Sequence, residues 1–156
     1  ENVVVSGVAF DKNESKLSIT DVPDRPGIAA KIFGALAKKN INVDMIIQSA
    51  ASEKYNDISF TVSKNDLKTA VLLLKNISKR LGAGAVIFDE NVAKVSIVGI
   101  GMRSHPGVAS KMFKILADNG INIQMISTSE IKISCVISNR DTDKAVRVLH
   151  GGFGLG

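Results

Sequence analysis

Residues 26–49 read PGIAAKIFGALAKKNINVDMIIQS, and residues 106–129 read PGVASKMFKILADNGINIQMISTS. These two segments align without gaps at an offset of 80, and 12 of their 24 positions are identical. The match resumes at an offset of 75 between residues 58–63 (ISFTVS) and 133–138 (ISCVIS). Such self-similarity indicates one folding unit present twice. A chain of 156 residues has room for two small domains of about 75 to 80 residues each.

The first copy predicts an alternation of strands and helices. Alternating apolar residues favour a strand at 16–22, and apolar positions at helical spacing favour a helix from Ile28. Asn40 is expected to end that helix in a left-handed conformation, with strands following from Ile41 and over 58–62. The second copy repeats this order, with a strand at 94–100, a helix from Val108 ended by Gly120, and strands from Ile121 and Ile131.

A second helix is expected in each copy. Ser63 and Ser138 each precede an aspartate by three residues, in the manner of a capping box. The connection around Glu130 is so short that the strands on either side must form an antiparallel hairpin, which argues against a Rossmann-type parallel sheet. A fourth strand at 85–88 completes the ferredoxin-like β-α-β-β-α-β unit.

The fourth strand of the second domain is expected to come from the N-terminus. After its second helix the second copy has no residues left for a strand, whereas residues 7–13 (GVAFDKN) align with residues 85–91 (AVIFDEN) at an offset of 78. Residues 2–10 would therefore pair with an otherwise open sheet edge. We expect an α+β protein with domain 1 at 16–92 and domain 2 at 2–10 plus 93–156.

The composition excludes several classes of protein. Apolar residues make up 45% of the chain, enough for a core, yet no apolar run is long enough to span a membrane. The N-terminus has no signal-peptide pattern, so a cytoplasmic location is expected. The net charge of +5 suits a solvated basic surface better than a nucleic-acid surface, because basic residues never occur in runs longer than two.

No catalytic or metal-binding set is visible. Gly99-x-Gly101 is only part of a dinucleotide fingerprint, because Ser104 stands where the third glycine belongs. The single cysteine, Cys135, alternates with apolar residues and is expected to be a buried structural thiol. The two histidines, His105 and His150, have no neighbouring ligand set, so no metal site is expected.

The remaining signal is the pair of Pro-Gly turns between a strand and a helix. Free N–H groups in the first turn of a helix can bind a carboxylate, and glycine allows a ligand close to the backbone. Asp24 could then meet an ammonium group. The alternative is that Asp24 and Ser104 merely cap their helices while the glycines make turns. Polar residues also follow each helix, at Asn42, Asp44, Gln48 and Ser49 and at Asn122, Gln124 and Ser129, where solvated strand surface is the simpler interpretation.

The segments DRPGIAAKIF (24–33) and SHPGVASKMF (104–113), with INVDMIIQS and INIQMISTSEIKISCVI, resemble the paired ACT domains of the aspartate kinase regulatory region. The resemblance implies feedback control of the first step of aspartate-family amino-acid synthesis, by threonine or by lysine and threonine together. It also implies a homodimer formed through ACT domains, with a catalytic domain or alpha subunit as partner. ATP and Mg²⁺ would bind only that catalytic domain, which this sequence lacks, so the chain alone should not be an enzyme.

The resemblance further implies two effector pockets at domain interfaces. The first, for threonine, would use Asp24, Gly27, Ile28, Ala29 and Gln48, closed by Asn122 and Ile123 of the facing domain. The second, weaker and for lysine or threonine, would use Met102, His105, Gly107, Val108, Ser129 and Glu130, with Asn42, Val43 and Asp44 opposite. The second turn lacks a counterpart of Asp24, so equal affinities are not expected. Two alternatives stay open: a structural dimerisation module without ligand, and the ACT region of another amino-acid-biosynthetic enzyme.

Overall fold

The computed structural model describes residues 4–102 and 105–156, and these residues divide into two compact units. The first-repeat unit is Asn13–Glu90, and the second-repeat unit combines Glu1–Lys12 with Asn91–Gly156. Residues 2 and 3 of the expected N-terminal strand lie outside the described residues, as does Ser104. Within the described part of the chain, no helix has the length and apolar character needed to cross a bilayer.

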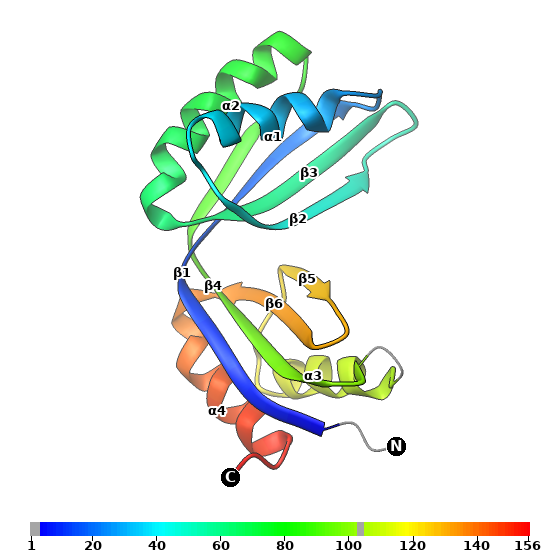
Figure 1. Cartoon of the computed structure of the whole chain (residues 1–156), viewed down its shortest axis with the longest axis vertical. Helices are drawn as coiled ribbons and strands as arrows, with labels where there is room; N and C mark the ends of the chain where they lie inside the picture. Colours follow the sequence, from blue (N-terminus) through cyan, green and yellow to red (C-terminus); the bar gives the residue numbers. More distant parts are fainter. Residues whose placement is uncertain (1–3, 103–104) are drawn as a thin grey trace. The chain divides into compact units, whose positions relative to one another are not determined.

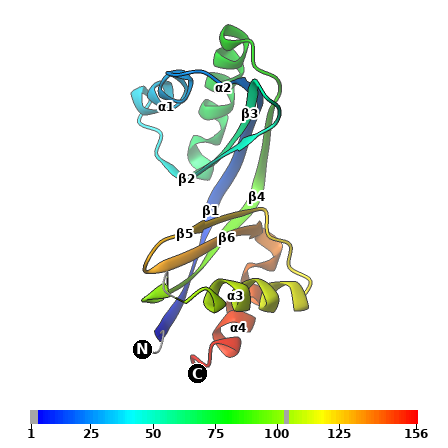
Figure 2. The ribbon, with the colours of Figure 1, turned by 90° about the vertical axis from the view of Figure 1, so that its right-hand side faces the viewer.

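The first-repeat unit places two helices on one face of its strands (Figures 1 and 2). In the register between strands, Leu17 lies opposite Phe60 and Ile19 opposite Ile58, so these four side chains share the face that the helices cover. All four are fully or almost fully buried. The strands are ordered β2-β3-β1-β4, and the elements are β1 (Val4–Pro23), α1 (Ile28–Lys38), β2 (Val43–Ala50), β3 (Tyr55–Val62), the 3-10 helix η1 (Lys64–Asp66), α2 (Leu67–Leu81) and β4 (Val86–Ile100).

The second-repeat unit repeats this arrangement, in the strand order β1-β4-β6-β5. The Ser6 hydroxyl donates to the Val98 carbonyl at 3.2 Å, and Val5 and Val8 pack on the core of this unit. The predicted α+β class with an antiparallel sheet that includes the N-terminal strand is therefore confirmed. The further elements are α3 (Gly107–Asp118), β5 (Met125–Thr128), β6 (Lys132–Ser138), the 3-10 helix η3 (Asn139–Asp141) and α4 (Thr142–Gly152).

Two strands are longer than the sequence pattern indicated. We expected separate strands at 2–10 and 16–22, but β1 runs without interruption from Val4 to Pro23. Likewise, β4 joins the expected strands at 85–88 and 94–100. The intervening residues, 11–15 (DKNES) and 89–93 (DENVA), contain neither glycine nor proline, so nothing local turns the backbone and the strands continue through them.

The helix ends follow the prediction, whereas the strands after them begin later than expected. Asn40 and Gly120 adopt φ values of 57° and 71°, the left-handed conformation expected for them. The next N–H, of Ile41 or Ile121, then bonds back to a helix carbonyl at 3.1 Å or 2.9 Å. Those N–H groups cannot serve a strand ladder, so β2 begins at Val43 and β5 at Met125.

The predicted capping boxes do not form. Neither Ser63 nor Ser138 makes a side-chain hydrogen bond at a helix start. Instead, a 3-10 turn precedes each helix, and the Asp66 N–H donates to the Ser63 carbonyl at 3.0 Å. A main-chain hydrogen bond therefore stabilises this turn in place of the expected side-chain cap.

Candidate functional site

The first Pro-Gly turn leaves the start of α1 without a side-chain cap. Gly27 is the N-cap residue with φ of 90°, a conformation that glycine adopts without strain. The Lys31 N–H donates to the Gly27 carbonyl at 3.1 Å and the Ile28 N–H to the Arg25 carbonyl at 3.4 Å, so the N–H groups of Ala29 and Ala30 lie outside the regular bonding of the helix. The interpretation of Asp24 as the helix cap is wrong, because α1 has no side-chain cap hydrogen bond. The first turn of α1 therefore offers N–H donors together with the positive end of the helix dipole.

A hollow of about 280 Å³ opens beside this helix start. Gln48 on the edge strand β2 lies opposite Ile58 of β3 in the register, so its side chain shares the helix-covered face of the sheet. The hollow brings together five of the residues expected in the first pocket, Asp24, Gly27, Ile28, Ala29 and Gln48. Its volume lies just below the usual range of ligand sites, which begins at about 300 Å³. Its full lining is residues 22–30 with Gln48, Asn56 and Ile58.

Asn56 is the lining residue that sequence reasoning missed. It is buried, and it lies opposite Val22 across the β1–β3 ladder. We had begun the third strand at Ile58, whereas β3 begins at Tyr55. A polar residue two positions before an apolar one keeps the alternation of the strand, and this was the signal that could have identified it.

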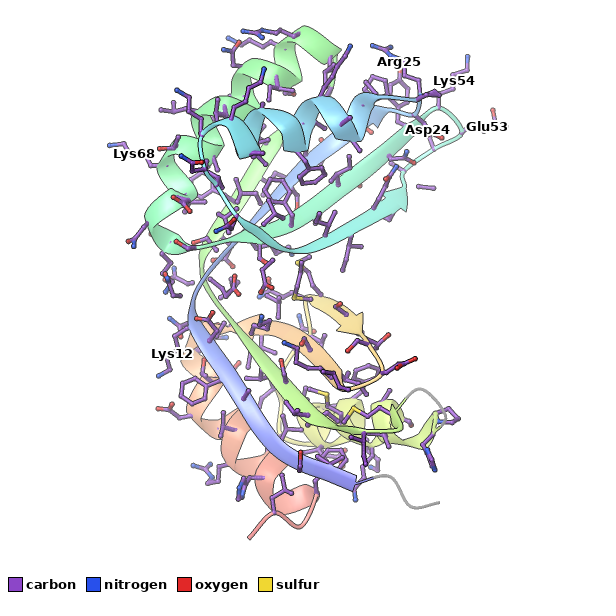
Figure 3. All side chains as sticks on the ribbon, in the orientation of Figure 1. Lys12, Asp24, Arg25, Glu53, Lys54 and Lys68 are labelled. Atoms are coloured by element: carbon purple, nitrogen blue, oxygen red, sulfur yellow. The ribbon has the colours of Figure 1, made fainter. Side chains whose placement is uncertain are left out.

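Charged side chains surround Asp24 at the exposed end of the turn. Figure 3 shows Asp24 near Arg25, Glu53 and Lys54, where α1 begins and the β2–β3 connection turns. The Asp24 N–H donates to the Lys54 carbonyl at 2.8 Å, which fixes the turn against that connection. The Asp24 side chain is exposed. N–H donors and a nearby carboxylate on one side of a small hollow are complementary to a zwitterion.

Asn122 and Ile123 lie in the second-repeat unit, between α3 and β5. We had expected them on a strand, but the strand starts only at Met125. Asn122 is exposed and Ile123 is half-buried against the core of its own unit.

Three of the residues expected in the second pocket form hydrogen bonds within the second-repeat unit. Met102 is buried, and its N–H donates to the Glu130 carbonyl at 3.2 Å. His105 Nδ1 lies 2.9 Å from the Gly101 carbonyl oxygen, within its own turn. The Ser129 hydroxyl accepts from the Lys132 N–H at 3.1 Å, so it closes the β5–β6 turn.

The other members of that set are divided between the two units. Gly107 is the first residue of α3 and Val108 is half-buried on the core of the second-repeat unit. Asn42, Val43 and Asp44 belong to the first-repeat unit, at the start of β2.

Among the described residues, neither the Cys135 thiol nor the acidic side chains form a reactive or metal-binding site. Cys135 is fully buried in β6, and burial raises the pKa of its thiol to about 12, which keeps it protonated and unreactive. Among the described residues, no three His, Cys, Asp or Glu side chains gather as a metal site.

Comparison with known proteins places this arrangement in a family. A model of the ACT domain matches residues 20–76 and again residues 95–153. An aspartate kinase of Stutzerimonas stutzeri is 52% identical over 99% of this chain, which spans 38% of the length of that protein. A crystal structure of aspartokinase alpha and beta subunits has a TM-score of 0.90 and 50% identity, over 97% of this chain and 99% of the matched chain.

A second solved structure is similar over almost all of both chains. The ligand-free regulatory subunit of aspartate kinase from Thermus thermophilus has a TM-score of 0.89 and 42% identity, over 96% of this chain and 98% of its own. The ACT-domain model matches both repeats, and the solved regulatory subunits match over nearly their full length. This chain therefore belongs to the ACT-domain family, as a tandem pair of the aspartate kinase regulatory (beta) subunit type.

Proposed function

We propose that this chain binds threonine and thereby imposes feedback inhibition on aspartate kinase, the enzyme of the first step in lysine, threonine and methionine synthesis. The observation that carries the proposal is the hollow beside the start of α1, where uncapped N–H donors, the Asp24 carboxylate and Gln48 surround a space of about 280 Å³. Such a space suits one small amino acid and leaves little room for a nucleotide.

The chemistry of the hollow matches each group of the ligand. The threonine carboxylate accepts from the N–H groups at the start of α1, where the helix dipole adds to the attraction. Its ammonium group pairs with Asp24, and its hydroxyl bonds to the Gln48 amide, which can donate as well as accept. Asn122 and Ile123 of a facing domain close the pocket in this proposal, and that domain belongs to a second copy of the chain.

Lysine is proposed as a second effector at the second pocket. Asp44 and Glu130 supply carboxylates for a long cationic side chain, and Met102, His105, Gly107, Val108 and Ser129 would form the remaining wall with Asn42 and Val43. Lysine should bind the second pocket more weakly than threonine binds the first. The reason is that the second turn has Ser104 in the sequence position of Asp24 and so lacks its charge.

The catalytic part of aspartate kinase is the proposed partner, and the ligand signal passes to it through the ACT pair. The solved structure of aspartokinase alpha and beta subunits supports this assignment, because it contains both kinds of subunit and one of its chains is similar to this one. ATP and Mg²⁺ would act only in that partner, in the cytoplasm.

Calorimetric titration of the chain with threonine, lysine, methionine, isoleucine and phenylalanine tests the assignment. We expect heat of binding with threonine and a weaker response to lysine. No heat with any of the five would favour a structural dimerisation module, and a response confined to one of the last three would indicate the ACT region of another biosynthetic enzyme.

A further inference from the structure

A second hollow in the first-repeat unit shares no lining residue with the proposed effector pocket. It has a volume of about 360 Å³ and lies between the beginning of α2 and strand β4. Leu72 and Phe88 both line it and are 64% and 51% exposed, so the hollow presents two large apolar side chains to solvent. We call this hollow the α2–β4 groove; its lining is Lys64, Leu67, Lys68, Val71, Leu72, Phe88 and Glu90.

Five of the seven lining residues differ at the equivalent positions of the second repeat, whereas Val71 and Phe88 are matched by Val146 and Phe10. At the offsets that relate the copies, Lys68 corresponds to Asp143 and Glu90 to Lys12, so the two charges are exchanged. Lys12 Nζ and Asp143 Oδ1 form an ion pair at 3.2 Å, whereas the described residues show no ion pair between Lys68 and Glu90. Figure 3 labels Lys68 beside α2 and Lys12 on the N-terminal strand.

Of the two exposed apolar side chains of the groove, Leu72 is particular to the first repeat, whereas Phe88 has an exposed counterpart in Phe10. Leu72 corresponds to Arg147, an ordinary exposed residue of α4, while the core positions Ala70 and Leu74 correspond to Ala145 and Leu149. These two core positions thus carry the same residues in both copies, while the exposed position between them differs. Packing within the domain therefore does not require Leu72.

The wall formed by α2 is basic. The helix carries Lys68, Lys75, Lys79 and Arg80 and has no acidic residue. Lys64 in the preceding turn adds a further positive charge at the rim. The groove lining therefore carries two lysines and one glutamate, Glu90, around apolar side chains. An apolar floor with an excess of positive charge is complementary to a segment with apolar and acidic residues.

We propose that the α2–β4 groove docks an acidic amphipathic helix of a partner protein. One apolar side chain of that helix inserts between Leu72 and Phe88, and its carboxylates approach Lys64 and Lys68. A concave site receives a side chain from a helix, whereas a membrane surface would require apolar side chains that protrude together, and on α2 Leu72 is the one large apolar residue that is exposed. This site is separate from the proposed effector pocket.

Titration of the full chain with a fluorescent peptide tests the proposal. The probe is a helical peptide with leucines at i, i+3 and i+4 spacing and glutamates at its other positions, compared with the same peptide in which lysines replace the glutamates. We expect the acidic peptide to bind with amide shifts at residues 64–72 and 87–90, and the basic peptide not to bind. Binding of both peptides alike, or shifts elsewhere, would overturn the proposal.

Variants that carry the residues of the second repeat distinguish specific docking from nonspecific hydrophobic binding. Leu72→Arg should weaken acidic-peptide binding about tenfold, and the double variant Lys68→Asp with Glu90→Lys, which copies the Lys12–Asp143 pair, should weaken it further. Lys79→Asp changes charge on the same helix outside the groove and should have a smaller effect. Circular dichroism and thermal unfolding of each variant report whether it is folded.

Two other occupants give distinct results that count against the proposal. Vesicles containing anionic lipid that bind the chain in a Leu72-dependent way, when the acidic peptide does not, would assign the groove to a membrane. Self-association lost in Leu72→Arg, without peptide binding to the wild-type chain, would assign it to a second copy.

Discussion

The two Pro-Gly turns align residue for residue, yet they fold differently. In the first, Gly27 is the left-handed N-cap residue and α1 begins after it, at Ile28. In the second, Gly107 is itself the first helical residue, and the left-handed glycine is Gly101, six positions earlier. The strand-to-helix connection is two residues longer in the second copy, so the bend is made before the Pro-Gly pair. Identical dipeptides therefore take different backbone conformations, because the left-handed bend lies at Gly27 in the first copy and before the Pro-Gly pair in the second.

The largest expected effect comes from separating the repeats. A fragment of residues 93–156 lacks Val5, Val8 and the Ser6–Val98 hydrogen bond, so the β4 edge of its sheet is left open. We expect it to lose its entire folding free energy, about 5–15 kcal/mol for a domain, and to show no cooperative urea transition by circular dichroism.

Adding back the strand is the control for this experiment. Fusion of residues 2–10 to the fragment through a flexible linker should restore cooperative unfolding. If residues 93–156 melt cooperatively by themselves, the proposed division into 16–92 and 2–10 plus 93–156 would have to be abandoned.

The interlocked strands show how much of the fold could be predicted from the sequence. The internal repeat located both helix pairs and both hairpins, because apolar spacing and left-handed helix ends at Asn40 and Gly120 depend on local residues. The weak match of residues 7–13 to 85–91 also identified the N-terminal strand, since an open edge demanded a partner.

The remaining features depend on geometry that no local pattern contains. The continuity of β1 and β4 through polar residues depends on pairing along their whole length, and the same polar residues would suit a turn. Asn56 enters the hollow only through its register with Val22. The different roles of Gly27 and Gly107 depend on where the preceding bend is made, which the shared Pro-Gly sequence does not specify.

The next largest effect is expected on assembly. If Asn122 and Ile123 of a second chain close the first pocket, threonine has its full set of contacts only in the dimer and must favour it by linkage. At about 100 times its dissociation constant, threonine should stabilise the dimer by about 2.7 kcal/mol per site. Analytical ultracentrifugation at low micromolar concentration, with and without threonine, measures this shift. Threonine binding that leaves sedimentation unchanged would place the pocket within one chain.

Removal of Asp24 should make the first turn more like the second. The aligned position, 104, is a serine, so Asp24→Ala deletes the charge that distinguishes the two turns. Loss of a charged hydrogen bond to the threonine ammonium group should weaken binding by about 1.5–3 kcal/mol in calorimetry. Glu53→Gln, which removes a charge near Asp24 but outside the hollow, should change affinity much less. Equal losses in both variants would mean that net charge, and not a contact of Asp24, governs binding.

The smallest effect tests the backbone difference directly. A Cβ added at Gly27 or at Gly107 would meet nothing within 4 Å, so contacts cannot distinguish the two substitutions. Gly27→Ala places a side chain at φ of 90° and should destabilise the chain by about 1–2 kcal/mol. Gly107→Ala lies in a helix and should stabilise it by about 0.5 kcal/mol, because alanine restricts the unfolded chain. Thermal unfolding should therefore move in opposite directions, by about 2–4 °C per kcal/mol. Shifts of the same sign and size would show that the two turns share one conformation in solution, and the structural basis for unequal pockets would then be lost.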